Sequence, residues 1–397
     1  MSKLDNDLHE LAVSIDQAAL LQRIMHTDPI SRESSEIDVQ YSKGGDLAPH
    51  SELVPEDSMQ ASEPLIARVG AVSVNLSRPV RLVTTVIPKP WGQEIWYTGM
   101  EERGESQICD GGENTLPLSL YLALAPRHLC NTEPVLLLKV LDPKADAVLG
   151  DLYFEVHQDK REVYVVTCID PIAWPDGIGE IRYGMNQTMR KDLGDAAFRE
   201  QYAQTVATYA DLRRQIDSEA KPIDAATEQQ ARNAMNAFTA LRELAVGDVV
   251  TVPTWLPHSL QHGVRVVEFQ TPTYERYIIS FAQKVLTQEH WDYVHAIEHM
   301  SIDPPPRESF ETISDGVERI TAFEDFNVWH IDLNTASPLR LPTQIPYAVC
   351  MAVSGTIDVD HLRLAEEEAC FIPASAVSTT QIRGDEKARA LIAAPRL

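Results

Sequence analysis

The chain has 397 residues, 44% of them hydrophobic, and its 59 acidic side chains outnumber 34 basic ones, for a formal net charge of −25. This length and composition predict a globular protein of two or three domains with their own hydrophobic cores. The acidic balance argues against nucleic acid and anionic membranes as partners, because both are bound through clustered Lys and Arg.

Nothing in the sequence predicts export or a membrane anchor. No apolar run reaches the roughly 18 residues that a membrane-spanning helix needs, and charges interrupt residues 1–26, so a signal peptide is not expected there. The five cysteines are odd in number and lack CxxC spacing, which favours a reducing compartment. We therefore expect a cytoplasmic protein.

The first predicted segment comprises residues 1–66. Apolar residues recur at helical spacing near its start: Leu4, Leu8, Leu11, Ile15 and Ile24. This spacing predicts an amphipathic helix over about the first 26 residues. Residues 27–66 are rich in Asp, Glu, Ser and Pro with little periodicity, which indicates an extended acidic arm or linker.

Strands are predicted from residue 72 to about residue 166, where β-branched runs alternate with Pro and Gly. A segment that begins at Gly150 carries Glu155, His157 and Glu162. Successive side chains of a strand point to opposite faces, so Glu155 and His157 share one face. A reversal through residues 158–161 would return Glu162 to that face. One hairpin thus presents two carboxylates and an imidazole.

The pattern then changes to helical spacing. Apolar residues step by three and four at Phe198, Tyr202, Val206, Tyr209, Leu212 and Ile216, and again at Ala231, Met235, Phe238, Leu241 and Leu244. A Thr227-x-x-Gln230 capping pattern precedes the second series. These patterns predict a helical insertion at residues 171–245.

Strands resume at residue 248 and continue to about residue 281, before a short helix predicted at residues 288–300. Within this stretch, Gly247 opens a second motif that ends at His258, after a strand and a Pro253–Pro257 turn. Together the motifs supply two carboxylates and two imidazoles, a ligand set that suits a divalent metal with open coordination positions. The candidate ligands are Glu155, His157, Glu162 and His258.

The last segment, residues 301–397, is predicted to form short strands separated by turns. It has no ligand-x-His pair, so no metal is assigned to it. We expect it to serve packing and assembly, and a homodimer is possible on this reading.

These motifs resemble the two signature motifs of the cupin barrels, and within the cupins the chain is similar to the type I mannose-6-phosphate isomerase family over most of residues 80–397. Pro90-Trp91-Gly92, the apolar strand around Lys139, and the segment that ends at Arg276 carry further likeness. The resemblance implies a mainly β bicupin. Residues 67–170 and 246–300 would form the metal-binding barrel, residues 171–245 the helical domain, and residues 301–397 a degenerate barrel.

The resemblance also implies a zinc enzyme that interconverts mannose 6-phosphate and fructose 6-phosphate through an enediolate, with a sugar phosphate as its partner. Arg276 would stabilise the developing charge, and Lys139 or Glu268 would assist proton movement or substrate binding. Ordinary structural roles are the alternatives. Lys139 could be an edge-strand side chain that reaches solvent, and Arg276 could pair with Glu275 or Asp292 at the surface.

The chain departs from the family pattern at several points. It has Glu155 where the family usually has Gln, Gln158 where the family has Pro, and no Asn-His-Lys-Pro-Glu stretch, and its loop from Glu268 to Arg276 is about two residues shorter. A carboxylate in place of an amide would hold the cation tighter and weaken its Lewis acidity. Two alternatives stay open: an iron-dependent cupin dioxygenase and a non-catalytic sugar-binding cupin.

A five-residue segment, His295-Ala296-Ile297-Glu298-His299, matches the His-x-x-Glu-His pattern of some zinc proteases. Patterns this short occur by chance, and no other feature of the chain favours a protease. A third ligand would have to come from the C-terminal segment.

Overall fold

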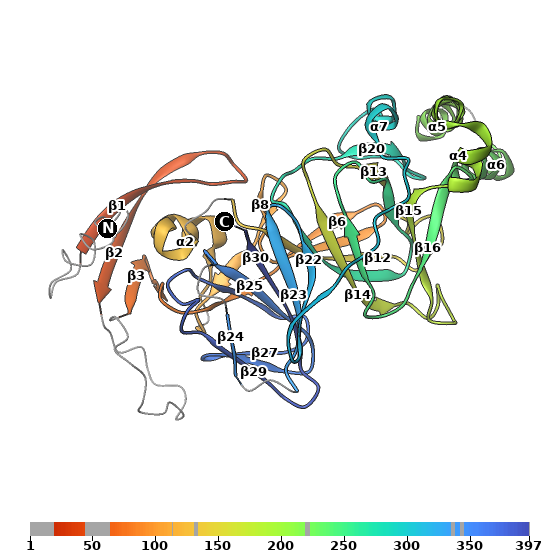
Figure 1. Cartoon of the computed structure of the whole chain (residues 1–397). Coiled ribbons are helices and arrows are strands. Elements are labelled where there is room, and N and C mark those ends of the chain that lie inside the picture. The colour runs from red at the N-terminus through yellow and green to blue at the C-terminus, as the bar shows by residue number, and fades with distance from the viewer. Residues whose placement is uncertain are drawn as a thin grey trace. The chain divides into compact units, whose positions relative to one another are not determined.

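The computed structural model describes residues 20–43, 64–112, 114–130, 134–218, 223–334, 338–341 and 345–396. The chain divides into two compact units (Figure 1). The first comprises the described residues up to Thr85, Trp96–Leu138, and those from Phe310 onward, and the second comprises Val86–Ile95 and Lys139–Ser309. Both are mainly β, and the larger helices belong to the second unit, which confirms the predicted β-protein with a helical insertion.

The first unit contains several antiparallel sheets. One has the order β1-β2-β3-β4, formed by Leu20–Thr27, Ser34–Lys43, Leu65–Val69 and Val72–Asn75. A nine-stranded sheet has the order β11-β10-β5-β28-β25-β30-β23-β22-β21, formed by Leu116–Pro117, Gln107–Cys109, Val80–Val83, Ala369–Ile372, Ala348–Ser354, Arg389–Pro395, Phe326–Asp332, Val317–Ala322 and Glu311–Ser314. A third sheet, β24-β29-β26-β27, is formed by Leu339–Arg340, Gln381–Gly384, Ile357–Val359 and Leu362–Leu364. The hairpin of β8 (Met100–Glu101) and β9 (Gly104–Glu105) and the helices α2 (Leu118–Leu124) and α3 (Pro126–Leu129) complete the unit.

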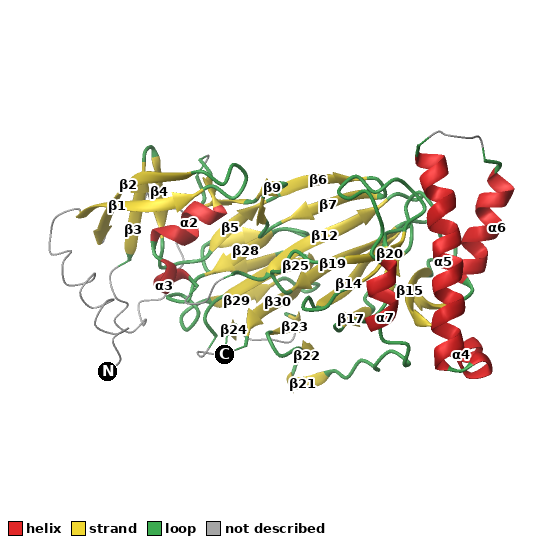
Figure 2. Ribbon diagram, turned by 90° about the horizontal axis from the view of Figure 1, so that it is seen from above, coloured by secondary structure: helices red, strands yellow, loops and turns green. Residues whose placement is uncertain are grey.

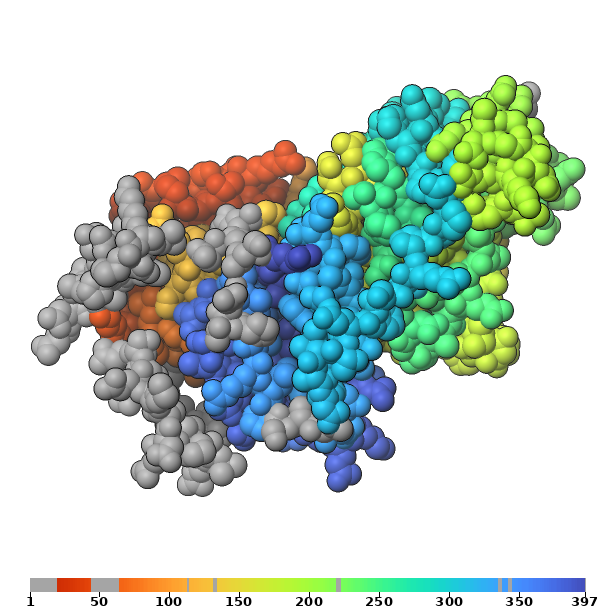
Figure 3. Space-filling view, in the orientation of Figure 1, coloured from red at the N-terminus to blue at the C-terminus, as the bar shows by residue number. Residues whose placement is uncertain are grey.

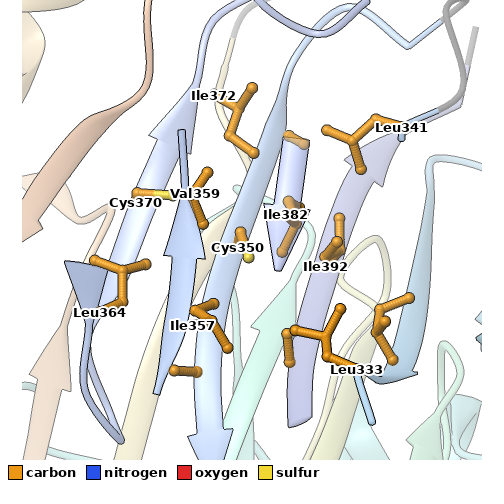
Figure 4. Close-up of a cluster of buried hydrophobic side chains, with 14 of the residues drawn as sticks. Leu333, Leu341, Cys350, Ile357, Val359, Leu364, Cys370, Ile372, Ile382 and Ile392 are labelled. Carbon is orange, nitrogen blue, oxygen red and sulfur yellow. The ribbon is translucent and has the colours of Figure 1, made fainter. Parts of the chain in front are cut away.

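The core of the first unit lies between the nine-stranded sheet and the sheet that contains β26 and β27 (Figure 4). In β26 and β27 the middle residue is exposed and its neighbours are buried, so each strand turns one face to the core and one to solvent. Cys350 and Cys370, directly paired across β25 and β28, are both fully buried and unbridged. All buried residues of this core lie between Val317 and Ile392 in the chain.

The N-terminal predictions are wrong where the structure describes the chain. Leu20–Thr27 is strand β1 and pairs with β2 in a regular antiparallel hairpin, rather than continuing a helix. Residues of the predicted arm form β2, in which Ile37, Val39 and Tyr41 alternate with polar residues, and Val39 and Tyr41 are buried. This period-2 pattern outweighs the helical spacing around Ile24. The other parts of both predictions, residues 1–19 and 44–63, lie outside the described residues.

The second unit is built on two sheets. The six-stranded sheet has the order β17-β14-β19-β12-β7-β6, formed by Val249–Val252, Glu162–Ile169, Val264–Gln270, Leu137–Pro143, Gly92–Trp96 and Thr85–Lys89. The five-stranded sheet has the order β16-β15-β18-β13-β20, formed by Thr239–Leu244, Gly179–Met185, His258–Leu260, Phe154–Val156 and Tyr277–Ser280. A buried apolar cluster that includes Tyr164, Val266, Leu260 and Ile278 draws on strands of both sheets. The metal motifs therefore belong to a double-sheet scaffold with a shared core.

Helices cover one side of this unit: α4 (Gln187–Leu193), α5 (Asp195–Asp217), α6 (Ala225–Asn236) and α7 (Tyr293–His299). Four residues of the predicted stripe of α5 (Phe198, Tyr202, Val206 and Tyr209) are buried and pack with Met235 of α6 and with Phe238, and α5 and α6 lie side by side (Figure 2). The stripe's last two residues, Leu212 and Ile216, are only partly buried. Helices α5 and α7 also contact each other, and both are visible at the surface in Figure 3. Within the described residues, no helix is both long and apolar enough to cross a bilayer.

The second helical series is only partly confirmed. Helix α6 ends at Asn236, and Thr239–Leu244 forms strand β16, which pairs with β15. The cap is Asp224, whose carboxylate accepts a hydrogen bond from the Thr227 backbone N–H at 2.9 Å. Pairing with the neighbouring strand therefore overrides the spacing of Leu241 and Leu244.

The two units also follow boundaries other than those predicted. Strand β5, which lies in the range predicted for the metal barrel, pairs with β28 near the C-terminus through Cys370 and Arg81. Local patterns identify strands but not their distant partners, so the sequence did not reveal that residues 96–138 join the C-terminal strands.

The two motif glycines meet different requirements. A Cβ at Gly150 would overlap the carbonyl oxygen of Lys144 and lie 2.7 Å from the Cβ of His262, whereas a Cβ at Gly247 would meet nothing. Gly247 instead has φ +94°, a left-handed conformation that other residues adopt only at a cost. The first glycine allows close backbone approach, and the second allows the turn before β17.

We expect Gly150→Ala to destabilise the protein more than Gly247→Ala. The first change forces the backbone apart, at about 2–3 kcal/mol, and the second costs about 1 kcal/mol through the left-handed conformation. Urea unfolding of both variants measures the difference. Equal losses, or a larger loss for Gly247→Ala, would contradict the steric explanation.

Candidate metal centre

Three strands of the second unit position the four predicted ligands. Glu155 lies on β13, His157 directly after it, Glu162 at the start of β14 and His258 at the start of β18. Strands β13 and β18 pair so that Glu155 lies opposite His258. Val156, between the first two ligands, points to the opposite side and packs in the helix-covered cluster. The pairing of β13 with β18 thus places the two motifs side by side, and alternation along β13 places Glu155 and His157 on the same face.

Three of the predicted ligands form one group. One ligand atom from each of Glu155, His157 and His258 lies within 4.8 Å of the others. Both histidines are buried, with whole-residue exposures of 1% for His157 and 2% for His258. Neither Nε2 has a hydrogen-bond partner among the described residues, and the same holds for Glu155 Oε2. Buried polar atoms without partners are costly, and a divalent cation between them would satisfy all three.

The tautomer of His258 suits a metal. Its Nδ1 lies 3.0 Å from the Leu256 carbonyl oxygen. A carbonyl only accepts hydrogen bonds, so Nδ1 carries a proton and Nε2 is the ring nitrogen that faces the group. His157 differs, because its Nδ1 finds no partner among the described residues.

Glu162 adjoins both imidazoles but has other partners too. Its oxygens lie 3.4 Å from His157 Nε2 and 3.1 Å from His258 Nε2. The same carboxylate pairs with Lys160 Nζ at 2.6 Å and accepts a hydrogen bond from the Tyr164 hydroxyl at 2.6 Å. It is well placed to be a fourth ligand, and this role stays a prediction.

The protonation states of His157 and Glu162 favour cation binding, whereas at His258 the nearby Glu162 carboxylate outweighs burial and raises the pKa, so a cation would have to displace a proton there. Burial, with the positive charge of Lys160, lowers the pKa of His157, so the imidazole is neutral. Burial opposes ionisation of Glu162, but Lys160 and His157 outweigh it and hold the pKa of Glu162 well below its usual value. A neutral imidazole and an ionised carboxylate are the forms that bind metal.

Lys139 is not an edge-strand residue. It lies on β12, an interior strand of the six-stranded sheet, and is 8% exposed. Its Nζ is 3.2 Å from Glu268 Oε2 and 3.9 Å from Glu94 Oε1. Although burial alone would lower the pKa of Lys139, these carboxylates outweigh burial and raise it. The lysine is therefore a buried cation with two carboxylate neighbours.

Glu268 and Glu162 are neighbouring carboxyl groups whose pKa values are driven apart. Burial and the charge of Glu162 raise the pKa of Glu268 well above its usual value, against the opposing effect of Lys139. Of the two carboxyl groups, Glu268 therefore takes up a proton more readily and Glu162 keeps its negative charge more readily. Two carboxyl groups with separated pKa values are a common arrangement for acid–base chemistry.

Three charged residues near the site were not singled out from the sequence: Glu94, Lys89 and Lys160. Glu94 is 8% exposed and pairs with Lys89 at 3.2 Å as well as facing Lys139. Lys160 is 7% exposed and pairs with Glu162. The position of Lys160 inside the first motif could have identified it, because a lysine between two predicted ligands has little chance of staying in solvent.

Arg276 does not form either ion pair considered from the sequence. Its guanidinium carbon lies 4.6 Å from the centre of the Tyr153 ring, and it donates a hydrogen bond to the Thr287 hydroxyl. Its Nε is buried without a partner among the described residues. Burial opposes its charge, but the carboxylate of Glu155 outweighs this and raises the pKa of Arg276. The arginine is thus electrostatically linked to a predicted metal ligand.

The His-x-x-Glu-His segment forms no second cluster of this kind. His295 and His299 lie exposed on α7, with ring centres 4.3 Å apart. Among the described residues, the only group of three or more potential ligands is Glu155, His157 and His258. No third protease-type ligand joins the pair there.

We expect one divalent cation per chain in protein purified without a metal-affinity column. His258→Ala should weaken binding by more than the 10- to 100-fold typical of residues that merely support a ligand. The measurement is metal content by mass spectrometry, followed by chelator competition. His295→Ala is the matched control, because it removes an exposed imidazole. Equal metal content in both variants would contradict the site.

We expect the buried pair to behave as a coupled unit. Lys139→Met should destabilise the protein by about 1–3 kcal/mol, because it leaves Glu94 and Glu268 without their shared partner. Adding Glu268→Gln should restore part of this loss, with a coupling energy above about 0.5 kcal/mol. A double-mutant cycle from urea unfolding measures it, and strict additivity would show that the two side chains do not interact.

No protein-family model and no curated protein sequence matches the chain. Solved structures do. Mannose 6-phosphate isomerase from Bacillus subtilis matches with a TM-score of 0.56 and 16% identity, over 80% of this chain and 99% of that one. A variant of phosphomannose isomerase from Salmonella typhimurium matches with a TM-score of 0.59 and 13% identity, over 81% and 100%. A zinc-bound mannose 6-phosphate isomerase matches with a TM-score of 0.58 and 14% identity, over 81% and 100%. The chain therefore has the cupin fold of the phosphomannose isomerases.

Proposed function

We propose that this protein is a metal-dependent aldose–ketose isomerase that interconverts mannose 6-phosphate and fructose 6-phosphate, or a related phosphorylated sugar. One observation carries the proposal. A buried group of potential metal ligands lies in the same barrel as a protonatable Lys139–Glu268 pair and the cationic Arg276. The fold shared with phosphomannose isomerases supports the choice of substrate.

Glu155, His157 and His258 would hold the cation, with Glu162 as the predicted fourth ligand. When bound, a divalent cation polarises a substrate carbonyl oxygen as a Lewis acid. Zinc is our first expectation, because imidazole and carboxylate ligands suit it and a zinc-bound isomerase has this fold.

Isomerisation moves a proton between two carbons beside a carbonyl group, so the site must take up and return protons without water. Glu268 and Lys139, 3.2 Å apart and almost fully buried, are the groups we assign to this task. Burial raises the pKa of Glu268, so its carboxyl group takes up a proton more readily than an exposed glutamate does. Glu268 would donate its proton to a substrate oxygen, and the carboxylate so formed would accept the proton from the carbon beside the carbonyl group.

Arg276 would stabilise the negative charge of the enediolate or bind the phosphate. Its guanidinium is permanently charged and already oriented against Tyr153 and Thr287. In a protein with a net charge of −25, an anionic substrate needs such a local cation. Lys139 and Lys160 add to the positive charge of the same unit.

Two other functions make different demands. An iron dioxygenase would use the same ligands but would consume oxygen. A non-catalytic sugar-binding protein would have no use for a buried acid–base pair, which costs desolvation energy to keep. The Lys139–Glu268 pair therefore favours a catalyst over a binding protein.

The test is solvent exchange. Metal-free protein reconstituted with zinc, manganese or iron is incubated with fructose 6-phosphate in D₂O, and NMR follows deuterium entry and mannose 6-phosphate formation. We expect both with at least one metal. Arg276→Ala should lower kcat by about 100-fold or more, and Arg276→Lys should lower kcat by less. The control is Arg307→Ala, which removes an exposed arginine of the same unit and should leave kcat unchanged.

Two results would contradict the proposal. Oxygen uptake with iron and no sugar isomerisation would indicate the dioxygenase. Sugar binding without deuterium exchange, unaffected by Arg276→Ala, would indicate a non-catalytic protein.

A further inference from the structure

The loop between strands β13 and β14, residues 157–161, carries the predicted ligand His157 and the buried Lys160. Its middle residues, Gln158 and Asp159, are exposed. Both donate their backbone N–H groups to one side chain. Gln158 donates to Glu275 Oε1 at 2.5 Å, and Asp159 donates to Glu275 Oε2 at 2.8 Å. A single carboxylate thus binds two consecutive amides directly after a predicted metal ligand.

We propose that Glu275 is a positioning residue, whose carboxylate holds the 157–161 loop and thereby sets the place of His157 for metal binding. Two oxygens and two N–H groups match one to one, and hydrogen bonds to an ionised acceptor are stronger than neutral ones. Successive backbone N–H groups that converge on one anion form a recurrent anion-binding arrangement. Here the anion belongs to the protein.

The two predicted imidazole ligands are supported in different ways. His258 donates from Nδ1 to the Leu256 carbonyl, the usual way in which a metal-bound imidazole is oriented. His157 Nδ1 has no such partner among the described residues. Its backbone is held instead, because its carbonyl oxygen accepts a hydrogen bond from the Trp255 N–H at 2.6 Å and Glu275 binds the next two amides. These backbone hydrogen bonds take the place of a hydrogen bond to the His157 ring.

The other end of the loop is held independently. Thr271 donates from its backbone N–H to the Arg161 carbonyl at 3.0 Å, and its hydroxyl oxygen accepts from the Arg161 N–H at 3.0 Å. Removing Glu275 would therefore free only the middle of the loop. Water can take over the two exposed amides, so we expect little loss of folding stability and a specific loss of ligand geometry.

Glu275 also precedes Arg276 in the chain. Its carboxylate turns to the metal loop and the arginine turns to Tyr153 and Thr287, so neighbouring residues act on different parts of the site. The inference rests on the proposed metal centre but not on the sugar chemistry.

The experiment measures zinc affinity by chelator competition for the wild type and three variants. Glu275→Ala should weaken zinc binding by about 10- to 100-fold. The zinc affinity of Glu275→Gln should lie between those of the wild type and Glu275→Ala, because the amide oxygen can accept a hydrogen bond from one of the two N–H groups. Asp159→Asn is the matched control. It removes one negative charge from the same loop and keeps both backbone bonds, and should change the affinity by less than about threefold because exposed charge is screened.

Hydrogen–deuterium exchange of metal-free protein provides a second measurement. Glu275→Ala should speed exchange in peptides that cover residues 157–161, and Asp159→Asn should not. Unchanged exchange in Glu275→Ala would overturn the proposal, even if the wild type bound no zinc. So would unchanged zinc affinity, or an equal loss in Asp159→Asn, which would make the effect one of charge.

The two proposals fail separately. The positioning role would be supported if the zinc affinities of the variants follow the expected order. The isomerase would be contradicted if the same protein incorporates no deuterium into sugar phosphates.

Discussion

The pairing of β13 with β18 is the constraint on which the rest of the site depends. It places Glu155 opposite His258 and so joins two motifs that a helical insertion separates in the chain. Because side chains alternate along β13, the same pairing turns Glu155 and His157 into the barrel and Val156 toward the helices. A slip of one residue would exchange these faces and bury an apolar side chain where a ligand is needed.

The barrel interior must also keep its charges compensated. Lys139 lies between Glu268 and Glu94, Glu94 also pairs with Lys89, and Glu162 pairs with Lys160. Each ion pair taken from water carries a desolvation cost, so such a network lowers stability relative to an apolar core. Its presence in an otherwise apolar sheet is more easily explained by chemistry than by folding.

The sequence predicted what depends on local pattern. Glu155, His157 and His258 form a group because strand alternation and motif spacing are local properties, and the helical stripe of α5 was recognisable for the same reason. Long-range pairing was not predictable. Leu20–Thr27 is a strand because β2 lies beside it, and Thr239–Leu244 is a strand because β15 needs a partner. Strand β15 lies far upstream of its partner, whereas the alternation of β2 is a local signal that stands among charged residues.

The role of Glu155 follows from its charge. Glu155 adds a negative charge beside the cation site, and the charge of Glu155 raises the pKa of Arg276. Glu155 is also the most accessible of the three grouped side chains, at 17% exposure against 0% for His157 and 3% for His258. An approaching anion would therefore meet the site from the side of Glu155, where Arg276 offsets the added charge. In the proposed function, this arrangement would let a tightly held cation remain compatible with an anionic substrate, which a carboxylate ligand alone would repel.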